Sequence, residues 1–393
     1  MRAADLDHPG RGAATAVGVI DATLTQVPAR APIQTLRALA LSGLGPMYDR
    51  DARRFVFRLK RSAAGIVREG LSTRYTAIAA IGLAQEDPAV VRDILAGQRL
   101  NDVLRQLIGD ADKLTNLGDL ALLAWAGRVC DCNTNRLWDR LTVLQPETNV
   151  HPTVEVAWAL SAAVFDAAAP PALAHMLAER LRGTFAPDAG LFPHTTGATG
   201  SLRAHVSCFA DFVYPTMALA QYGRAVDDSE SIACAARSAE TMCRLQGAGG
   251  QWWWHFDVRT GMIVEQYPVY AVHQDSMAPM ALFAVEHAIG RDFSAAVARG
   301  LQWLWSAPEL RGRSLVDADA GLIWRKVARR EPAKLSRGVQ AFVSRVSADL
   351  RAPGLDQLFP PTAIDYEDRP YHLGWVLHAW PEGRACHWDR KLS

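Results

Sequence analysis

Six segments of the chain are apolar nearly all round, and they alternate with segments that are apolar on one face only. Such a pattern is typical of buried helices that alternate with surface helices. The apolar segments are rich in Ala, Leu, Met and Trp and begin with polar or aromatic residues; they span 74–83, 116–125, 151–160, 211–220, 275–284 and 368–377. In two of them an Asp is followed by Pro four residues later and then by Met-Ala-Leu. The pattern predicts six buried helices.

The intervening segments have the periodicity of helices that show one face to water. In 172–182 the leucines and Met176 fall on one stripe, and 229–246 and 293–305 have the same character. Alternation of β-branched residues is nearly absent, so strands are expected only as short pieces such as 262–264.

A second unit recurs in the later part of the chain. Asp188-Ala-Gly-Leu-Phe-Pro-His194 matches Asp319-Ala-Gly-Leu-Ile-Trp-Arg325, and Gly249-Gly-Gln-Trp-Trp-Trp-His255 stands at the equivalent place between an outer and an inner helix. Each predicts a glycine-centred turn and a short extended piece that lays aromatic side chains over the helix ends. The match also makes Asp319 a turn residue.

Six buried helices that alternate with amphipathic ones fit an all-α (α/α)6 toroid, with six inner helices in mutual contact and six outer helices around them. The pattern resembles the superfamily shared by six-hairpin glycosidases, unsaturated-uronate hydrolases and N-acylglucosamine 2-epimerases. Terpene cyclases and prenyltransferases use similar toroids. The resemblance covers roughly residues 60–380 and is one of architecture.

The chain is therefore expected to consist of an N-terminal helical or irregular extension, residues 1–60, and a toroid domain, residues 61–385. A basic stretch between Arg50 and Arg61 is expected to be a solvated or docking face before the first buried helix. The region of about 325–352 is similarly basic and is expected to form an inserted, lid-like helix.

Composition narrows the class of protein. The 42 basic and 41 acidic side chains give a formal net charge of +1, so there is no electrostatic case for nucleic acid or an anionic membrane as partner. No apolar run approaches the roughly 18 residues that span a bilayer, and residues 1–10 lack the pattern of a secretory signal, so a cytoplasmic protein is expected. The six cysteines have no paired zinc spacing and are expected to be free thiols.

In a toroid the N-terminal ends of the inner helices surround one funnel, so polar residues far apart in sequence converge there. Hydrolysis of a glycosidic bond needs one protonated and one ionised carboxyl about 5–10 Å apart. The candidates for acid/base catalysis, led by two carboxylates, are Asp275, Asp211, His273, Glu367, Asp368 and His372. An Asp at a helix start can instead be an N-cap, and that alternative stays open for each of them.

His273 and His372 could form a two-histidine acid/base pair, which the resemblance to 2-epimerases implies for histidines on different inner helices. No metal site is expected, because His273 and Asp275 do not share a helix face and Cys208 with Asp211 would need a distant histidine. The chain has no glycine-rich phosphate loop and no dinucleotide fingerprint, so no cofactor is expected either.

Residues that combine aromatic rings with hydrogen-bonding groups are expected to hold a small-molecule or oligosaccharide substrate: Arg74, Tyr75, Tyr214, Trp253, Tyr270, Gln274 and Tyr371. Sugar rings stack on aromatic side chains, and their hydroxyl groups need polar partners. An isoprenoid pocket would instead be almost entirely apolar apart from one acid or a metal cluster.

These features favour a carbohydrate-active enzyme, foremost a glycoside hydrolase-like enzyme that acts on an oligosaccharide or a uronate-containing glycan by general acid/base catalysis. A sugar epimerase is the alternative within that class. A terpene- or prenyl-type cyclase is the runner-up, although segment 316–321 only approximates the Asp-x-Asp-Asp acid of protonating cyclases. A non-catalytic binding module is the third alternative.

Overall fold

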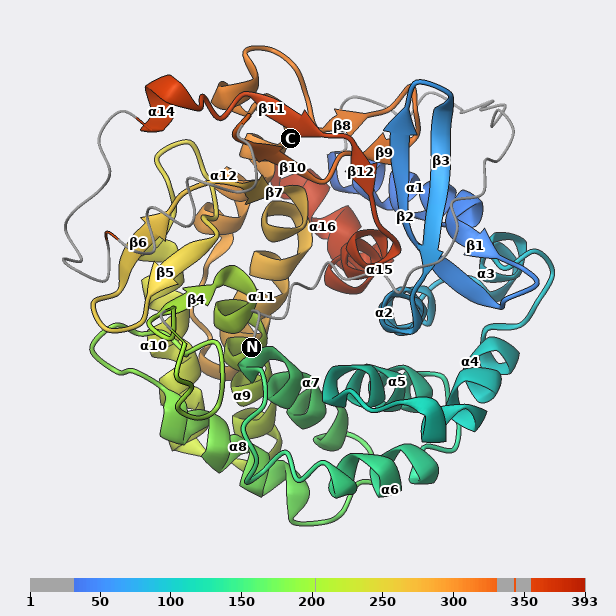
Figure 1. Ribbon diagram of the computed structural model, residues 1–393, viewed down its shortest axis with the longest axis vertical. Helices are drawn as coiled ribbons and strands as arrows, with labels where there is room; N and C mark the ends of the chain where they lie inside the picture. The colour runs from blue at the N-terminus through green and yellow to red at the C-terminus, as the bar shows by residue number, and fades with distance from the viewer. Residues whose placement is uncertain (1–31, 202, 331–342, 344–354, 393) are drawn as a thin grey trace.

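Six helices form an inner ring around the centre of the molecule, as Figure 1 shows. They are α2 (Thr73–Leu83), α5 (Leu117–Val129), α7 (Thr153–Ala163), α9 (Phe209–Val226), α11 (Ala278–Ile289), which follows a π-helical turn (His273–Met277), and α15 (Pro370–Ala379). Each contacts the next along the chain, and α15 packs against α2 to close the ring. The six buried helices predicted from the sequence and the predicted (α/α)6 toroid are confirmed.

The other helices lie outside this ring. They are α1 (Pro32–Met47), α3 (Pro88–Ile94), α4 (Leu100–Gly109), α6 (Asn135–Val143), α8 (Leu173–Thr184), α10 (Ser229–Leu245), α12 (Ser294–Ser306), α14 (Leu355–Leu358) and α16 (Glu382–Leu392), with 3-10 turns at Ala111–Lys113 and Pro308–Leu310. The three amphipathic segments predicted from the sequence are α8, α10 and α12. Helix α1 packs on α15 and α16, so residues 32–47 of the predicted N-terminal extension lie against the toroid.

This computed structural model describes residues 32–201, 203–330, 343 and 355–392. Most of the basic insertion predicted at about 325–352 lies outside the described residues, but its start, Lys326–Ala328, is strand β10. Within the described part of the chain, no helix is both long and apolar enough to cross a membrane.

Local sequence explains where inner helices begin, and burial explains why their residues are apolar on all sides. The Ser72 hydroxyl accepts a hydrogen bond from the Tyr75 amide at the start of α2. At the start of α5 the Asn116 side chain accepts one from the Asp119 amide. Such caps pair amides that the first helical turn leaves free. Every residue of α7 is buried, so this helix has no water-facing stripe to give an amphipathic period.

The ring closes where α2 and α15 approach each other at two glycines. A Cβ atom on Gly82 would lie 2.2 Å from the carbonyl oxygen of Gly374, and one on Gly374 would lie 2.6 Å from the carbonyl oxygen of Ile78. Two backbones can approach this closely only where neither carries a side chain.

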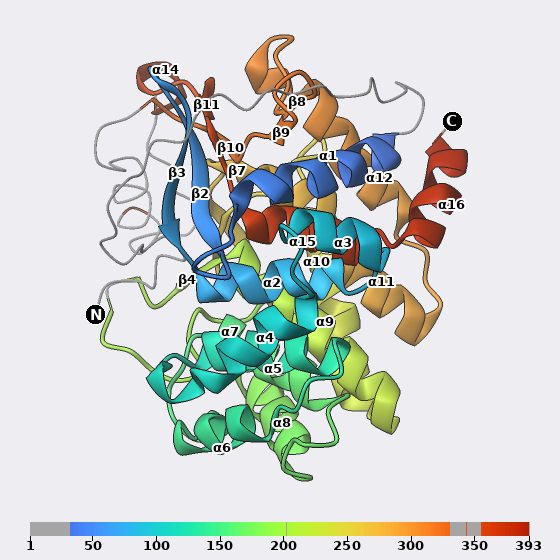
Figure 2. The same cartoon turned by 90° about the vertical axis from the view of Figure 1, so that its right-hand side faces the viewer.

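Most of the strands lie on the face of the ring where the inner helices begin, which we call the strand face; Figure 2 shows β2 and β3 to one side of the helices. The strands are β1 (Tyr48–Asp49), β2 (Arg54–Ser62), β3 (Gly65–Leu71), β4 (Val206–Cys208), β5 (His255–Asp257), β6 (Met262–Glu265), β7 (Val269–Tyr270), β8 (Val316–Asp317), β9 (Leu322–Ile323), β10 (Lys326–Ala328), β11 (Ala363–Asp365) and β12 (Glu367–Asp368). Pairings among the described strands are antiparallel, in the groups β1–β2–β12 with β3, β4–β5–β6, β7–β10–β11 and β8–β9. Strand β6 is the piece predicted at 262–264.

The hairpin of β2 and β3 corrects the expectation that strands would be only short pieces. Of the stretch expected to be a solvated or docking face, Arg50, Arg53, Lys60 and Arg61 are exposed. In β2, Phe55, Phe57 and Leu59 are buried at alternate positions; of the residues between them Arg58 is half-buried, whereas Val56 is buried as well. The basic side chains meet acids, since Arg58 forms ion pairs with Glu69 and Glu367. A period of two was present in the sequence, but the run of charges concealed it.

The predicted glycine-centred turns are confirmed. Gly190, Gly250 and Gly321 have φ angles of 70°, 95° and 65°, in the left-handed region that glycine adopts most readily. Asp319 lies in the turn between β8 and β9, as the repeat predicts.

The closure of the ring gives a stability prediction. Gly82→Ala is expected to lower the free energy of unfolding by about 1–3 kcal/mol or more, because the new methyl group has no space beside Gly374. Gly183→Ala in α8 is the matched control, because a methyl group there would meet no other atom within 4 Å. It should leave stability unchanged or raise it by up to about 1 kcal/mol. Denaturant unfolding measures both, and equal stabilities for the two variants would contradict the closure argument.

Candidate functional site

Two histidines at the starts of inner helices are each held by a buried aspartate. The first is His194, between α8 and α9, whose Nδ1 lies 2.9 Å from Oδ2 of Asp211 in the first turn of α9. The same Oδ2 accepts the Cys208 amide at 2.8 Å, so Asp211 both caps its helix and binds His194. The Asp211 side chain is 0% exposed, whereas that of His194 is 28% exposed.

The second pair joins His372 in α15 to Asp275 in the π-helical turn. Nε2 of His372 lies 2.7 Å from Oδ2 of Asp275, and the two side chains are 3% and 0% exposed. Oδ1 of Asp275 accepts the Ser276 hydroxyl at 2.9 Å. Because Pro279 has no N–H, it cannot donate to the Asp275 carbonyl oxygen four residues earlier, and the indole N–H of Trp380 supplies that donor. Asp275 is therefore tied to three partners.

Charge and burial set the protonation of both histidines. Asp211, through its charge and its hydrogen bond, raises the pKa of His194 to about 11. Burial alone would lower the pKa of His372, but Asp275 and Asp368 together raise it above its usual value. Both environments therefore favour the imidazolium form.

His273, the third histidine of the region, has different surroundings. Its ring lies 4.5 Å from that of Phe209 and 4.9 Å from that of Tyr270, and its Nδ1 lies 3.4 Å from the carbonyl oxygen of Trp252. Burial lowers the pKa of His273 to about 3, so its ring is neutral. In the structure His273 therefore contacts the Trp252 carbonyl oxygen, whereas His372 pairs with Asp275.

Gln274 and Trp253, which were expected to hold substrate, are buried in packing contacts. The Gln274 amide donates to the carbonyl oxygens of Trp252 and Tyr270 at 3.4 and 3.2 Å, and its oxygen accepts the Trp252 amide at 3.1 Å. Trp253 packs edge-on against Tyr267 at 5.9 Å. Both side chains brace the tryptophan-rich turn.

The two acids before α15 are also buried. Glu367 accepts Nη2 of Arg369 at 2.9 Å and binds Arg58 of β2. Asp368 accepts the amides of Arg369 at 2.7 Å and Ile323 at 3.3 Å. Burial raises the pKa of Asp368 to about 6, although the nearby His372 lowers it. Asp368 is therefore a carboxyl that takes up a proton close to neutral pH.

Aromatic side chains lie at the same helix starts. Tyr75 stacks on Phe57 at 5.3 Å and contacts Tyr371 at 4.8 Å, which joins α2, β2 and α15. Tyr214 packs edge-on against a tryptophan of α7 at 5.1 Å, and Tyr270 contacts His273. The four tyrosines predicted to hold substrate thus come from β7 and three inner helices.

Arg74 links three inner helices through ion pairs. Its Nε donates to Asp119 of α5 at 2.7 Å, and its Nη2 donates to Glu155 of α7 at 3.1 Å and to Asn116. Burial would lower the pKa of Arg74, but the two carboxylates raise it. This predicted substrate-holding residue is charged and already paired with acids.

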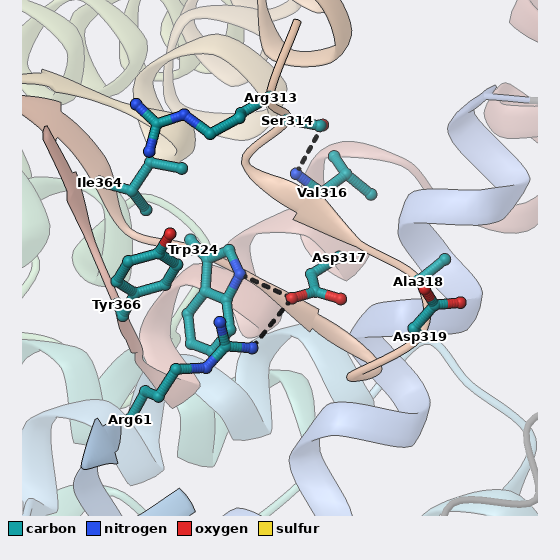
Figure 3. Close-up of a pocket in the computed structure, with 10 residues that line it drawn as sticks. All are labelled: Arg61, Arg313, Ser314, Val316, Asp317, Ala318, Asp319, Trp324, Ile364 and Tyr366. Carbon is teal, nitrogen blue, oxygen red and sulfur yellow. Dashed lines mark hydrogen bonds and ion pairs between the residues drawn. The ribbon is translucent and has the colours of Figure 1, made fainter. Parts of the chain in front are cut away.

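A pocket of about 260 Å³ lies between the β8–β9 turn and Tyr366, as Figure 3 shows. The Arg61 guanidinium lies 4.5 Å from the Trp324 ring and 3.2 Å from Asp317. Trp324 donates to the same carboxylate at 3.0 Å. None of the site residues predicted from the sequence lines this pocket.

Sequence reasoning missed His194, although a signal for it was present. The three repeated turns end in His194, His255 and Arg325, so a basic or titratable residue occupies the last position each time. Arg325 lies 3.5 Å from Glu367, and His255 is paired with Cys208 in the register of β4 and β5. The end of each repeat therefore delivers such a side chain to the strand face.

Comparison with solved structures identifies the fold. A sugar epimerase from a ruminal bacterium is similar, with a TM-score of 0.58 at 10% sequence identity over 88% of this chain and 97% of that chain. The protein is an (α/α)6 toroid. This toroid is also similar to a possible member of the GH105 family from Salmonella enterica, with a TM-score of 0.52 at 10% identity over 96% and 100% of the two chains.

A third similar toroid is the GH76A alpha-1,6-mannanase from a Salegentibacter species, with a TM-score of 0.51 at 11% identity over 92% of this chain and 99% of that chain. In sequence, no protein-family model and no curated protein matches this chain. The likeness is therefore one of fold.

The buried pair in this toroid gives a pH prediction. Asp275→Asn should lower the pKa of His372, because burial then acts without the opposing charge of Asp275. Since the folded pKa of His372 is raised above 6.5, the pair stabilises the wild type fully below that pH and less as pH rises through the folded pKa. In the variant this pH dependence of stability should be flatter.

Imidazole NMR titration and denaturant unfolding against pH measure the two effects. Asp257→Asn is the control, because Asp257 is an equally buried acid that pairs with Arg259 instead of a histidine. An unchanged His372 titration in Asp275→Asn would show that the pair does not set its charge.

Proposed function

We propose that this protein is a carbohydrate-active enzyme that removes and returns a proton at a sugar carbon next to a carbonyl group, as a sugar epimerase or isomerase does, with His194 and His372 as acid and base. The observation that carries this proposal is the pairing of each histidine with a fully buried aspartate at the start of a different inner helix. A histidine backed by a carboxylate is a common proton carrier in enzymes.

The chemistry needs two groups that exchange one proton each. Both histidines favour the imidazolium form, so the one that acts as base first gives its proton to solvent. In an open-chain sugar the C–H bond beside the carbonyl is weakly acidic, and this neutral imidazole then removes its proton to leave an enediolate. An imidazolium then returns a proton to carbon from the other face, which inverts the centre, or to the neighbouring carbon, which gives the isomeric ketose or aldose. Asp211 and Asp275 act as positioning residues that orient the rings and stabilise the imidazolium forms.

The same burial weighs against hydrolysis by Asp211 and Asp275, the pair that the sequence placed first. Their side chains are 0% exposed, and each has an oxygen engaged by a histidine. A hydrolase needs one carboxyl at the glycosidic oxygen and another at the anomeric carbon or its attacking water. Histidines are the groups that these aspartates present.

A sugar also fits the surroundings better than a hydrocarbon does. Tyrosines and ionisable groups share the helix starts, with Arg74, Asp119 and Glu155 among them. Sugar hydroxyls can pair with such groups, whereas an isoprenoid would leave them without partners. The three similar toroids are a sugar epimerase, a mannanase and a possible GH105 member, which supports this class.

Glycoside hydrolysis is the second candidate function, because Asp368 has the character of a general acid. Burial raises its pKa to about 6, and His372 interacts electrostatically with both Asp368 and Asp275. A carboxyl with a raised pKa is what proton donation to a leaving group requires.

A deuterium-exchange experiment separates these two functions. The purified chain is incubated in D2O with a panel of reducing aldoses and disaccharides, and NMR follows the C2 proton and new isomers. We expect solvent deuterium at C2, with rates about 10²–10⁴-fold lower in His194→Gln and in His372→Gln. His175→Gln is the control, because His175 is 59% exposed on outer helix α8 and should leave the rate unchanged.

The opposite result is equally clear. If oligosaccharides release new reducing ends without exchange at C2, and Asp368→Asn abolishes that release, hydrolysis replaces proton transfer as the function. Retention of full exchange in both His194→Gln and His372→Gln would reject the two-histidine proposal.

A further inference from the structure

Three side chains beside the start of α9 place a nitrogen, a sulfur and an oxygen within 4.8 Å of one another: His194, Cys208 and Asp211. Cys208 is the N-cap of α9 and Asp211 lies three residues later, so the two approach the same side of the helix start. His194 reaches them from the preceding segment, with its Nδ1 2.9 Å from Asp211 Oδ2.

A second observation points to a ligand at this place. Oδ1 of Asp211 is buried and has no hydrogen-bond partner among the described residues, although Oδ2 has two. A buried carboxylate oxygen without a partner is costly, and such orphans are rare in folded proteins. A cation beside Oδ1 would satisfy it.

We propose that His194, Cys208 and Asp211 form a Zn²⁺ site with three protein ligands and one open position. Imidazole nitrogen, thiolate sulfur and carboxylate oxygen are the donors that zinc takes in proteins. A thiolate ligand favours zinc over the hard cations Mg²⁺ and Ca²⁺, which prefer oxygen alone. Zinc bond lengths of about 2.0–2.3 Å place tetrahedral ligand atoms roughly 3.3–3.8 Å apart. Small side-chain rotations would bring the three ligand atoms, now within 4.8 Å of one another, to these distances.

The exchange of ions is balanced in charge. Binding replaces the proton on the His194 imidazole and the proton on the Cys208 thiol by one Zn²⁺, and two protons leave to solvent. The imidazolium, thiol and carboxylate sum to zero charge, as do Zn²⁺, neutral imidazole, thiolate and carboxylate. Zinc therefore adds no net charge to this partly buried place, and the Asp211 amide continues to donate to the Cys208 sulfur at the helix start.

Zinc at this place would control the protein. A metal-bound His194 can no longer carry a proton, so zinc should inhibit the proton transfer; this consequence rests on the proposed function, whereas the binding site itself does not. Binding is therefore measured directly, and its failure is distinguishable from a failure of the C2 exchange experiment.

The test uses the full chain titrated with Co²⁺, which reports thiolate ligation by a charge-transfer band in the near ultraviolet, and with Zn²⁺ by calorimetry. We expect one ion per chain and the thiolate band. Cys208→Ser should abolish the band, and both Cys208→Ser and His194→Gln should weaken Zn²⁺ binding by more than the roughly 10–100-fold that loss of an outer-shell partner costs.

Cys243→Ser is the matched control, because Cys243 is a half-buried thiol of outer helix α10 that belongs to no such cluster among the described residues. It should keep the band, the affinity and the rise in thermal midpoint that Zn²⁺ causes. Circular dichroism of each variant without metal verifies folding. A band or an affinity that survives in Cys208→Ser, or the absence of one-to-one binding in the wild type, overturns the proposal.

Discussion

The rest of the structure depends on the contact between the α2 and α15 backbones at Gly82 and Gly374. The first inner helix must meet the last, and two residues without side chains allow it. This approach brings the starts of both helices side by side on the strand face, where Tyr75 contacts Tyr371. The Tyr75 hydroxyl also accepts a hydrogen bond from Nη1 of Arg369 at 3.1 Å. Ring closure therefore also brings together two of the tyrosines that were predicted to hold substrate.

The candidate site is organised by two buried aspartates, each of which binds a histidine. Asp211 and Asp275 both precede a proline by four residues, so each helix has a carbonyl oxygen without its usual donor. At Asp275 the π-helical turn and Trp380 resolve this defect, and the carboxylate faces His372 of α15. At Asp211 the carboxylate caps the helix and holds His194. The capping alternative that the sequence left open thus applies to Asp211, whereas the Asp275 side chain binds Ser276 and His372.

The sequence predicts the inner helices well, because a helix buried on all sides shows its burial directly in composition. It predicts the hairpin β2–β3 poorly, since buried Phe55, Val56 and Phe57 stand between Arg54 and Arg58, which meet their acids only in the folded chain. Partners of the site residues were beyond reach for the same reason. His372 and Asp275 are separated by 97 positions, and only the order of helices around the ring makes them neighbours. Helix starts can be located from local sequence, but what faces each start cannot.

The histidines of the two pairs differ in their exposure to solvent. His372 is 3% exposed and its aspartate is fully engaged, so its charge is set inside the protein. His194 is 28% exposed and comes from the connecting segment between α8 and α9. The Cys208 thiol lies close to its partner Asp211, and one oxygen of that carboxylate has no hydrogen-bond partner among the described residues. His194 is therefore more accessible to an ion or small molecule in solution than His372 is.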